Sequence, residues 1–183
     1  MDGISLGYDI YHKTYDPSQS LVVARYKTVS TGAGVRLGYP IGEDDAINFG
    51  LSADRTTIST YDESPIQYKD FCIEFGCSSP DGIGEVSVSS LMATAGWSRD
   101  KRDSVIYPRS GSFQRLSLEG AVPPGELRYW RANYQYQHWF PIGQSEAFML
   151  NGDIGWAGGY GGKPMPFYKN FYLGGIGSVR GFD

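Results

Sequence analysis

The chain has 183 residues, of which 40% are hydrophobic and 15% aromatic, with 25 glycines and a mean hydropathy of −0.34. Its net charge is −4 and its Lys and Arg residues are scattered, so there is no basic stripe for a phosphate backbone and nucleic acid is excluded as an expected partner. No apolar run reaches the roughly 18 to 20 residues of a membrane-spanning helix, and residues 1–11 lack the layout of a signal peptide, which excludes a helical anchor.

Apolar and polar residues alternate along seven segments. Successive side chains of a β-strand point to opposite faces, so this alternation predicts strands with one apolar and one polar face. In the clearest segment, 130–137, aromatic residues and Ala alternate with one Arg, one Asn and two Gln, and a one-residue slip would turn all four polar side chains to the apolar face. The predicted strands cover residues 3–10, 32–39, 47–54, 91–98, 115–122, 130–137 and 148–156.

The connections between these segments fall into two groups that alternate along the chain. One group consists of compact or charged turns at 40–45, 99–112 and 141–146. The other consists of the connections 13–27, 59–85 and 123–126 and everything after residue 158. Antiparallel membrane barrels have short periplasmic turns and longer outer loops. We therefore predict an all-β, antiparallel up-and-down transmembrane β-barrel, read as one domain, with the second group as extracellular loops.

A soluble β-sandwich or a lipocalin-like barrel would also show alternating strands, with the apolar face turned inward. Two features favour the membrane interpretation. The polar face is rich in Gly, Ser and Asn, whereas a solvent-exposed face usually carries Lys and Glu. Aromatic residues also gather near strand ends, which is typical of the girdles at membrane interfaces. These residues are Tyr39, Trp97, Trp130, Phe140 and Trp156.

Cys72 and Cys77 are the only cysteines of the chain. A four-ligand zinc site would have to recruit His12 or His138 from distant segments, so we expect no metal site. A disulfide within the predicted loop 59–85 and a pair of free thiols both remain open.

A hydrolase is the competing functional class, because some outer-membrane barrels are enzymes. Hydrolysis needs a nucleophile with a positioned base. The two histidines, His12 and His138, lie near predicted strand ends, and Ser110 has no His nearby in the sequence. Asp100 and Asp103 lie among Arg and Lys residues, which indicates solvated ion pairs. We therefore expect neither catalysis nor a cofactor.

The stretch 158–183 resembles the long loop of the Omp85 family. Its core is the family's four-residue signature, made by Val179, Arg180, Gly181 and Phe182. A characteristic lead-in precedes the signature and makes the resemblance specific. This lead-in includes Pro164, Met165, Pro166, Phe167, Tyr168, Gly174 and Gly175. Stretches 36–41 and 96–111 are also similar to the family, so the resemblance covers essentially all 183 residues.

The resemblance implies a sixteen-stranded barrel in the outer membrane of a Gram-negative bacterium, preceded by periplasmic POTRA repeats. It implies an insertase that folds and inserts nascent outer-membrane β-barrel proteins, with membrane lipid around it and accessory lipoproteins bound through the repeats. In the family, the residue matching Arg180 pins the loop inside the barrel by pairing with acidic residues of later strands. A guanidinium offers a carboxylate a planar fork of donors, which suits such a latch.

This chain departs from the family in extent. Seven strands are predicted where sixteen are expected, and the POTRA repeats and the first and last barrel strands are absent. The acidic partner of Arg180 is expected beyond the chain end. We therefore expect residues 1–183 to be an incomplete barrel domain whose insertase activity belongs to a longer parent chain. The alternative is a passive, porin-like or transporter barrel of the same superfamily.

Overall fold

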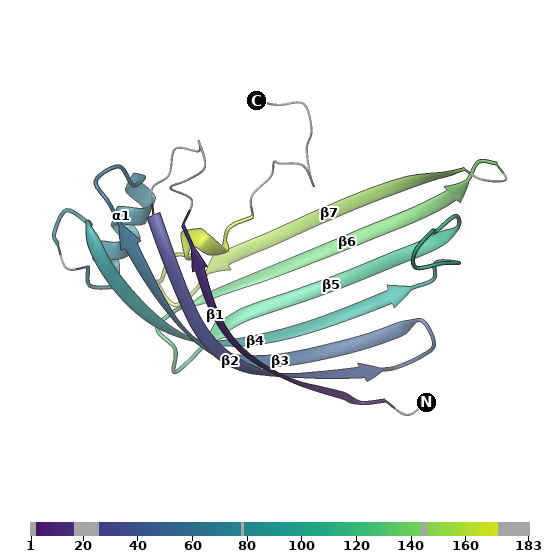
Figure 1. Cartoon of the computed structure of the whole chain (residues 1–183), viewed down its shortest axis with the longest axis horizontal. Helices are drawn as coiled ribbons and strands as arrows, with labels where there is room; N and C mark the ends of the chain where they lie inside the picture. The colour runs from purple at the N-terminus through teal and green to yellow at the C-terminus, as the bar shows by residue number, and fades with distance from the viewer. Residues whose placement is uncertain (1–2, 17–25, 78, 144–145, 172–183) are drawn as a thin grey trace.

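The computed structural model describes residues 3–16, 26–77, 79–143 and 146–171 (Figure 1). These residues form seven β-strands, one α-helix and one 3-10 helix, and none of the described helices is long and apolar enough to cross a membrane. The elements are β1 (Ser5–Tyr15), β2 (Tyr26–Pro40), β3 (Asp45–Thr60), α1 (Ile66–Glu74), β4 (Gly84–Asp100), β5 (Gly111–Val122), β6 (Tyr129–Pro141), β7 (Ala147–Gly159) and η2 (Phe167–Lys169).

The strands form one sheet in the order β1-β2-β3-β4-β5-β6-β7, and every neighbouring pair is antiparallel. The prediction of an up-and-down antiparallel arrangement is therefore confirmed. Within the described residues β1 and β7 each pair with a single strand, so the sheet is open, in agreement with the predicted incomplete barrel. Several strands are longer than predicted, most of all β3 and β4, which extend to Thr60 and back to Gly84.

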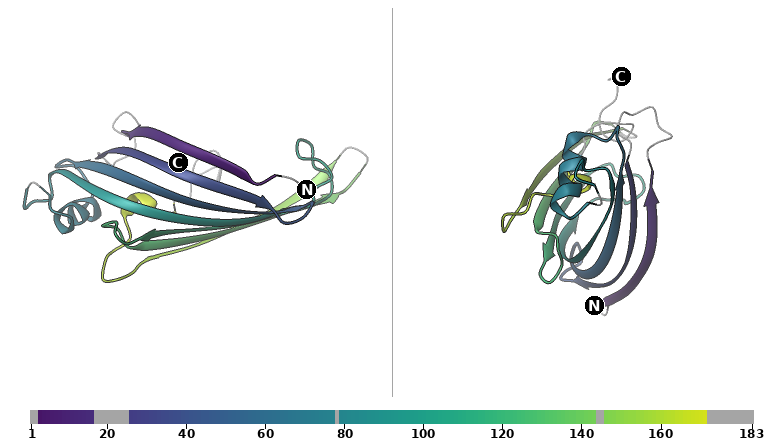
Figure 2. Two further views of the ribbon diagram at one scale, coloured as in Figure 1. Left: turned by 90° about the horizontal axis from the view of Figure 1, so that it is seen from below. Right: turned by 90° about the vertical axis from the view of Figure 1, so that its left-hand side faces the viewer.

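The sheet is strongly curved, and α1 and η2 lie on its concave side (Figure 2). The register keeps the two faces distinct, because Leu51 pairs with Ala93 on the convex face while Ser52 pairs with Met92 on the concave face. Large apolar side chains on the convex face are exposed, for example Leu51 at 52%. Contact with lipid accounts for such a surface in a membrane barrel.

The convex face changes character partway along β3 and β4. From Ile47 to Ala53 every second residue of β3 is apolar, but beyond this segment the convex positions are polar. There Thr57 Oγ1 lies 2.8 Å from Ser87 Oγ across the two strands. Asp45 and Arg55, the polar residues on either side of these apolar positions, are separated by about 33 Å along the strand, or roughly 25 Å along the membrane normal at a tilt of about 40°. This height matches the lipid-facing band of a membrane barrel, so β3 and β4 extend beyond the band at their loop ends.

The described core lies at this loop end, on the concave side. Its members are almost fully buried and come from the strands, the loops and α1. The sequence prediction treated 59–85 as a loop and missed α1 within it. Cys72 and Cys77 form a disulfide at the end of this helix. The buried residues of the core are Ile58, Phe71, Cys72, Val86, Val88, Ala121, Leu127, Tyr129 and Phe167.

The turn between β4 and β5 is an ordered structure at the opposite end of the sheet. Lys101 N donates to Ser112 O at 2.8 Å. Gly111 closes this turn with φ +104°, and a Cβ there would lie 2.0 Å from Lys101 O. A side chain is therefore excluded at Gly111 by both the backbone conformation and the close approach. The guanidinium of Arg102 lies over the Phe113 and Trp139 rings, at 5.1 and 5.5 Å from their centroids.

Candidate functional site: a loop docked on the concave face

The chain leaves β7 and turns back immediately over the concave face. Tyr160 N donates to Arg128 O at 3.1 Å, and the Tyr160 hydroxyl donates to Ala121 O at 2.5 Å. Gly161 and Gly162 follow with φ values of +64° and +75°, a left-handed conformation that glycine adopts without strain. These contacts direct residues 163–171 towards the inside of the curved sheet.

Phe167 anchors this segment in the core. Its side chain is 4% exposed, and its ring centroid lies 3.9 Å from that of Tyr68 and 5.6 Å from that of Phe71, both on α1. The ring also meets Tyr26 of β2 edge to face, with centroids 5.7 Å apart. Tilted and edge-to-face ring pairs at such separations are favourable beyond their buried area. Phe167 therefore joins the loop segment to α1 and to the sheet.

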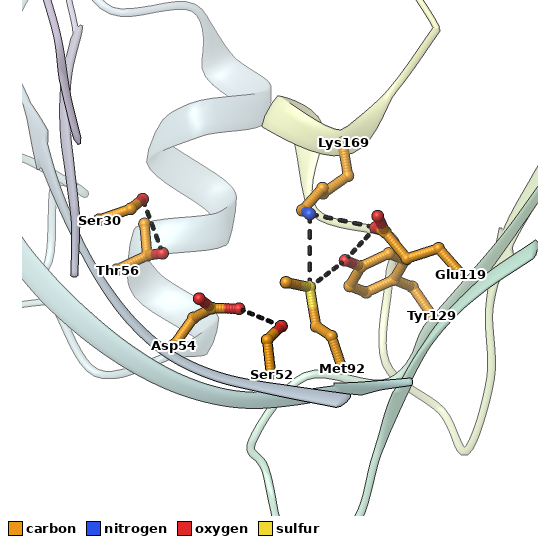
Figure 3. Close-up of polar contacts among 8 residues, drawn as sticks. All are labelled: Ser30, Ser52, Asp54, Thr56, Met92, Glu119, Tyr129 and Lys169. Atoms are coloured by element: carbon orange, nitrogen blue, oxygen red, sulfur yellow. Dashed lines mark hydrogen bonds and ion pairs between the residues drawn. The ribbon is translucent and has the colours of Figure 1, made fainter. Parts of the chain in front are cut away.

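Lys169 makes a polar contact with the sheet beside this aromatic cluster (Figure 3). Its Nζ lies 3.1 Å from Glu119 Oε1 on β5 and 3.4 Å from Met92 Sδ on β4. The Tyr129 hydroxyl donates to the same Glu119 oxygen at 2.6 Å, and Lys169 Nζ lies 5.6 Å from the Tyr129 ring centroid. Both charged side chains are about a quarter exposed or less. The pair is thus partly desolvated, which strengthens the charge-assisted bond relative to a surface pair.

Two further polar groups are buried near Glu119. Asp54 is 7% exposed, and its Oδ2 accepts a bond from Ser52 Oγ at 3.3 Å (Figure 3). Asp54 Oδ1 and the Tyr168 hydroxyl oxygen are both buried without a hydrogen-bond partner among the described residues. Burial and the negative charges of Asp54 and Glu119 raise the pKa of Tyr168, so its phenol stays neutral.

Phe171, the last described residue, lies against the wall of β6 and β7. The guanidinium of Arg131 sits 4.5 Å from its ring centroid. A Cβ at Gly155 would lie 2.8 Å from the Phe171 ring, so glycine at this strand position makes room for the ring. The docked segment therefore contacts β2, β4, β5, β6 and β7 over its length.

The predicted site residues fall into two groups. Pro164, Met165, Pro166, Phe167 and Tyr168 of the lead-in lie in the docked segment, which contacts the concave face. Gly174, Gly175 and the four signature residues, Val179, Arg180, Gly181 and Phe182, lie outside the described residues. Their placement in the barrel stays a prediction.

Sequence reasoning missed the residues that hold the lead-in, namely Lys169, Glu119, Tyr129, Met92 and Asp54. Glu119 and Lys169 are 50 positions apart, and only the register of the sheet brings them together. The sequence did contain one indication of this contact, because Glu119 is a charged residue on the predicted polar face of segment 115–122. The hydrolase candidates His12 and His138 contact Thr31 and Tyr136, at 2.8 and 3.2 Å.

All 183 residues match the family model described as the Omp85 superfamily domain. The chain is 42% identical over 185 aligned residues to the outer membrane protein assembly factor BamA of Neisseria meningitidis serogroup B, covering 100% of this chain and 23% of that protein. It also matches the crystal structure of BamA from Haemophilus ducreyi lacking POTRA domains 1-3, with a TM-score of 0.89 and 24% identity, over 99% of this chain and 35% of that one. The chain thus spans less than a quarter of the length of this curated relative.

Proposed function

Because the chain belongs to the Omp85 superfamily, as its match over residues 1–183 shows, we propose that it is part of an insertase that folds and inserts β-barrel proteins into the outer membrane. The fold and the relatives identify it as an outer-membrane β-barrel protein of a Gram-negative bacterium. In this proposal the seven strands are one part of a larger barrel, which the 23% coverage of the Neisseria relative supports.

The docked loop is the observation that carries the proposal. The segment 160–171 is fixed to the concave face by the Phe167 cluster and the Lys169–Glu119 pair, which supports a role for the long loop inside the barrel. We propose that this segment is the base from which the signature residues extend into the lumen. There the Arg180 guanidinium would pair with a carboxylate of the barrel wall.

The partners in this proposal follow from the role of the relatives. Nascent outer-membrane β-barrel proteins are the clients, and accessory lipoproteins bind to periplasmic repeats of the whole protein. Membrane lipid surrounds the convex face. The relative from Neisseria is named an assembly factor, which supports a role without covalent chemistry.

The test replaces Arg180 by Ala or Glu in the protein expressed from its natural gene, in cells depleted of the unaltered copy. We expect slower assembly of client barrels and a barrel that loses its heat resistance on gels at a lower temperature. Lys101→Ala, in the exposed turn at the other end of the sheet, is the matched charge-removal control. Unchanged client assembly and heat resistance in both Arg180 variants would refute the latch.

A passive pore or transporter barrel of the same superfamily is the second candidate. The open polar wall around Asn48, Ser117 and Asn133 favours it, because such a surface suits a water-filled lumen. Depletion separates the two functions. An insertase predicts that outer-membrane proteins fail to assemble, whereas a pore predicts lost conductance with normal assembly.

A further inference from the structure

A row of polar side chains borders the lipid-facing band of the convex face at the turn end of the sheet. Asp45 of β3 pairs with Arg99 of β4, Arg99 pairs with Gln114 of β5, and Gln114 pairs with Tyr136 of β6. Every second side chain of each strand faces lipid, as Leu51 does. All four residues occupy such lipid-facing positions and not the positions that face the lumen. Four adjacent strands therefore carry a continuous polar row on the face that meets lipid.

The charged end of this row lies at the edge of the lipid-facing band. Asp45 is the first residue of β3, and the apolar positions of the band begin at Ile47. The next row inward places Ile47 opposite Trp97, an aromatic residue of the type that marks membrane interfaces. This end of the sheet carries the short turns, which face the periplasm in membrane barrels. Asp45 and Arg99 thus lie at the level of the phospholipid headgroups of the inner leaflet.

The two charges form an ordered pair. Arg99 Nε and Nη2 donate to the two Asp45 carboxylate oxygens at 2.8 and 3.0 Å. Trp97 Nε1 donates to Asp45 Oδ1 at 3.1 Å, and the Arg99 guanidinium lies 5.5 Å from the Trp97 ring centroid. The bidentate contact engages one edge of the guanidinium, and Arg99 donates to no further acceptor within the described part of the chain. Its Nη1 group is therefore open to another anion, beside a carboxylate that can accept from another cation.

The tyrosines of β6 direct their hydroxyls towards the same end of the sheet. The Tyr134 hydroxyl donates to Gln114 Oε1 at 3.0 Å, and the Tyr136 hydroxyl lies 3.2 Å from His138 Nδ1. Gln114 and His138 both lie nearer to the turns than the tyrosine that contacts them. This orientation, with an apolar ring in lipid and a polar tip towards the headgroups, is the one that interfacial side chains adopt.

We propose that Asp45, Arg99, Gln114 and Tyr136 form a binding site for the headgroup of a zwitterionic aminophospholipid in the inner leaflet. The lipid phosphate binds the open edge of Arg99 and the neighbouring polar groups of Gln114 and Tyr136, and the lipid ammonium binds the Asp45 carboxylate. The side-by-side cation and anion complement a headgroup that carries both charges, whereas a purely anionic headgroup would meet repulsion from Asp45. This site goes beyond the proposed insertase function, since it concerns the lipid around the barrel.

The test uses the protein expressed from its natural gene, in nanodiscs that contain equal amounts of phosphatidylethanolamine and phosphatidylglycerol. Native mass spectrometry after release into detergent counts the phospholipids that remain bound. We expect the unaltered protein to retain phosphatidylethanolamine preferentially, and Arg99→Gln to lower total retention by about tenfold. Asp45→Asn should abolish or reverse the preference, because it removes the group that binds the ammonium.

The chain supplies a matched control in Arg36 and Asp9, a bidentate cross-strand pair of the same kind on the concave face, with bonds of 2.5 and 2.6 Å. Arg36→Gln should leave lipid retention unchanged. If Arg99→Gln lowers the heat resistance of the barrel, Tyr136→Phe combined with Gln114→Leu tests the row without altering a charge and should lower retention severalfold. Full retention in the variants, or the same preference in Asp45→Asn, would overturn the proposal. Because retention is measured on purified protein, such a failure leaves the insertase proposal standing.

Discussion

The two halves of the concave face differ although the same strands build them. At the loop end, Ile58, Val86 and Val88 on the concave side are nearly fully buried beneath α1 and the docked loop. Towards the turns, the same face carries residues such as Asn48 and Ser117 around an open hollow. The concave face is therefore apolar where protein covers it and polar where the lumen is open.

The convex face changes in the opposite sense at the same level of the sheet. On the turn side of this level the convex face presents Leu51 and Leu91 to lipid, and on the loop side Ser87 and Glu85 face water. Strands β3 and β4 thus reverse their apolar side where they leave the membrane, because the apolar side chains follow whichever side excludes water. The surroundings of a strand, and not the strand itself, therefore set which of its faces is apolar.

Removal of Phe167, the anchor of the docked loop, should have the largest effect, because it uncovers the apolar half of the concave face. Phe167→Ala deletes an aromatic side chain that is 4% exposed, a change that typically costs about 3 to 5 kcal/mol. We expect residues 160–171 to become accessible to protease and the urea midpoint of the purified protein to fall. Ile66→Ala on the outside of α1, where Ile66 is 76% exposed, is the control and should change little. Equal protease resistance of both variants would show that Phe167 does not hold the loop.

A charge placed on the convex face should test where this face changes from apolar to polar along β3 and β4. Leu51→Arg puts a guanidinium near the middle of the lipid-facing band, which should lower the free energy of unfolding by about 2 to 4 kcal/mol. Ser87→Arg puts the same group beyond the band and should cost about 1 kcal/mol or less. Unfolding of both variants in liposomes with urea measures the difference. Similar costs at the two positions would place the upper edge of the band elsewhere.

The change of polarity along β3 and β4 also explains which parts of the fold the sequence predicts. Alternation identified all seven strands, but the predicted segments 47–54 and 91–98 stop where the polarity changes, which is why the loop ends of β3 and β4 were missed. Helix α1 gave no signal because it has no side-chain cap and no acidic residue in its first turn. It is held by the burial of Phe71 and Cys72 and by the disulfide. The alternation of apolar and polar residues indicates where a strand contacts lipid. The tertiary packing that holds α1 produces no periodic pattern in the sequence.

The family resemblance is confirmed by the match over the whole chain, yet it identified only part of the site. The lead-in residue Phe167 was found from its motif. Lys169 and Glu119 were not, because their pairing depends on where the loop crosses β5. The signature around Arg180 lies outside the described residues, so its role stays a prediction.

The Lys169–Glu119 pair should contribute less to loop docking than Phe167 does. Removing either partner leaves a largely buried charge without its ion-pair partner, at a cost of about 1 to 3 kcal/mol. We expect Lys169→Met and Glu119→Gln each to raise protease access to the loop, and the double variant to cost less than the sum of the two. The double-mutant cycle, measured by urea unfolding, isolates the coupling. Strict additivity would show that the two side chains act independently in spite of their 3.1 Å separation.

The smallest effect is expected far from the docked loop, in the β4–β5 turn. Asp103 accepts backbone bonds from Arg109 N and Ser110 N at 2.9 and 3.2 Å, and these bonds lower the pKa of its carboxyl below the ordinary value. A lowered pKa in the folded state means that the carboxylate stabilises the turn above its unfolded pKa of about 4 and loses this contribution as the pH falls through the folded value.

Hydrogen exchange should therefore show Ser110 N protected at pH 7 and less protected in acid. Asp103→Asn should lower the protection at pH 7 and reduce its dependence on pH, while the docked loop, which lies at the other end of the sheet, keeps its exchange rates. Exchange at Ser110 that responds to acid as strongly in Asp103→Asn as in the unaltered protein would exclude this carboxylate as the cause.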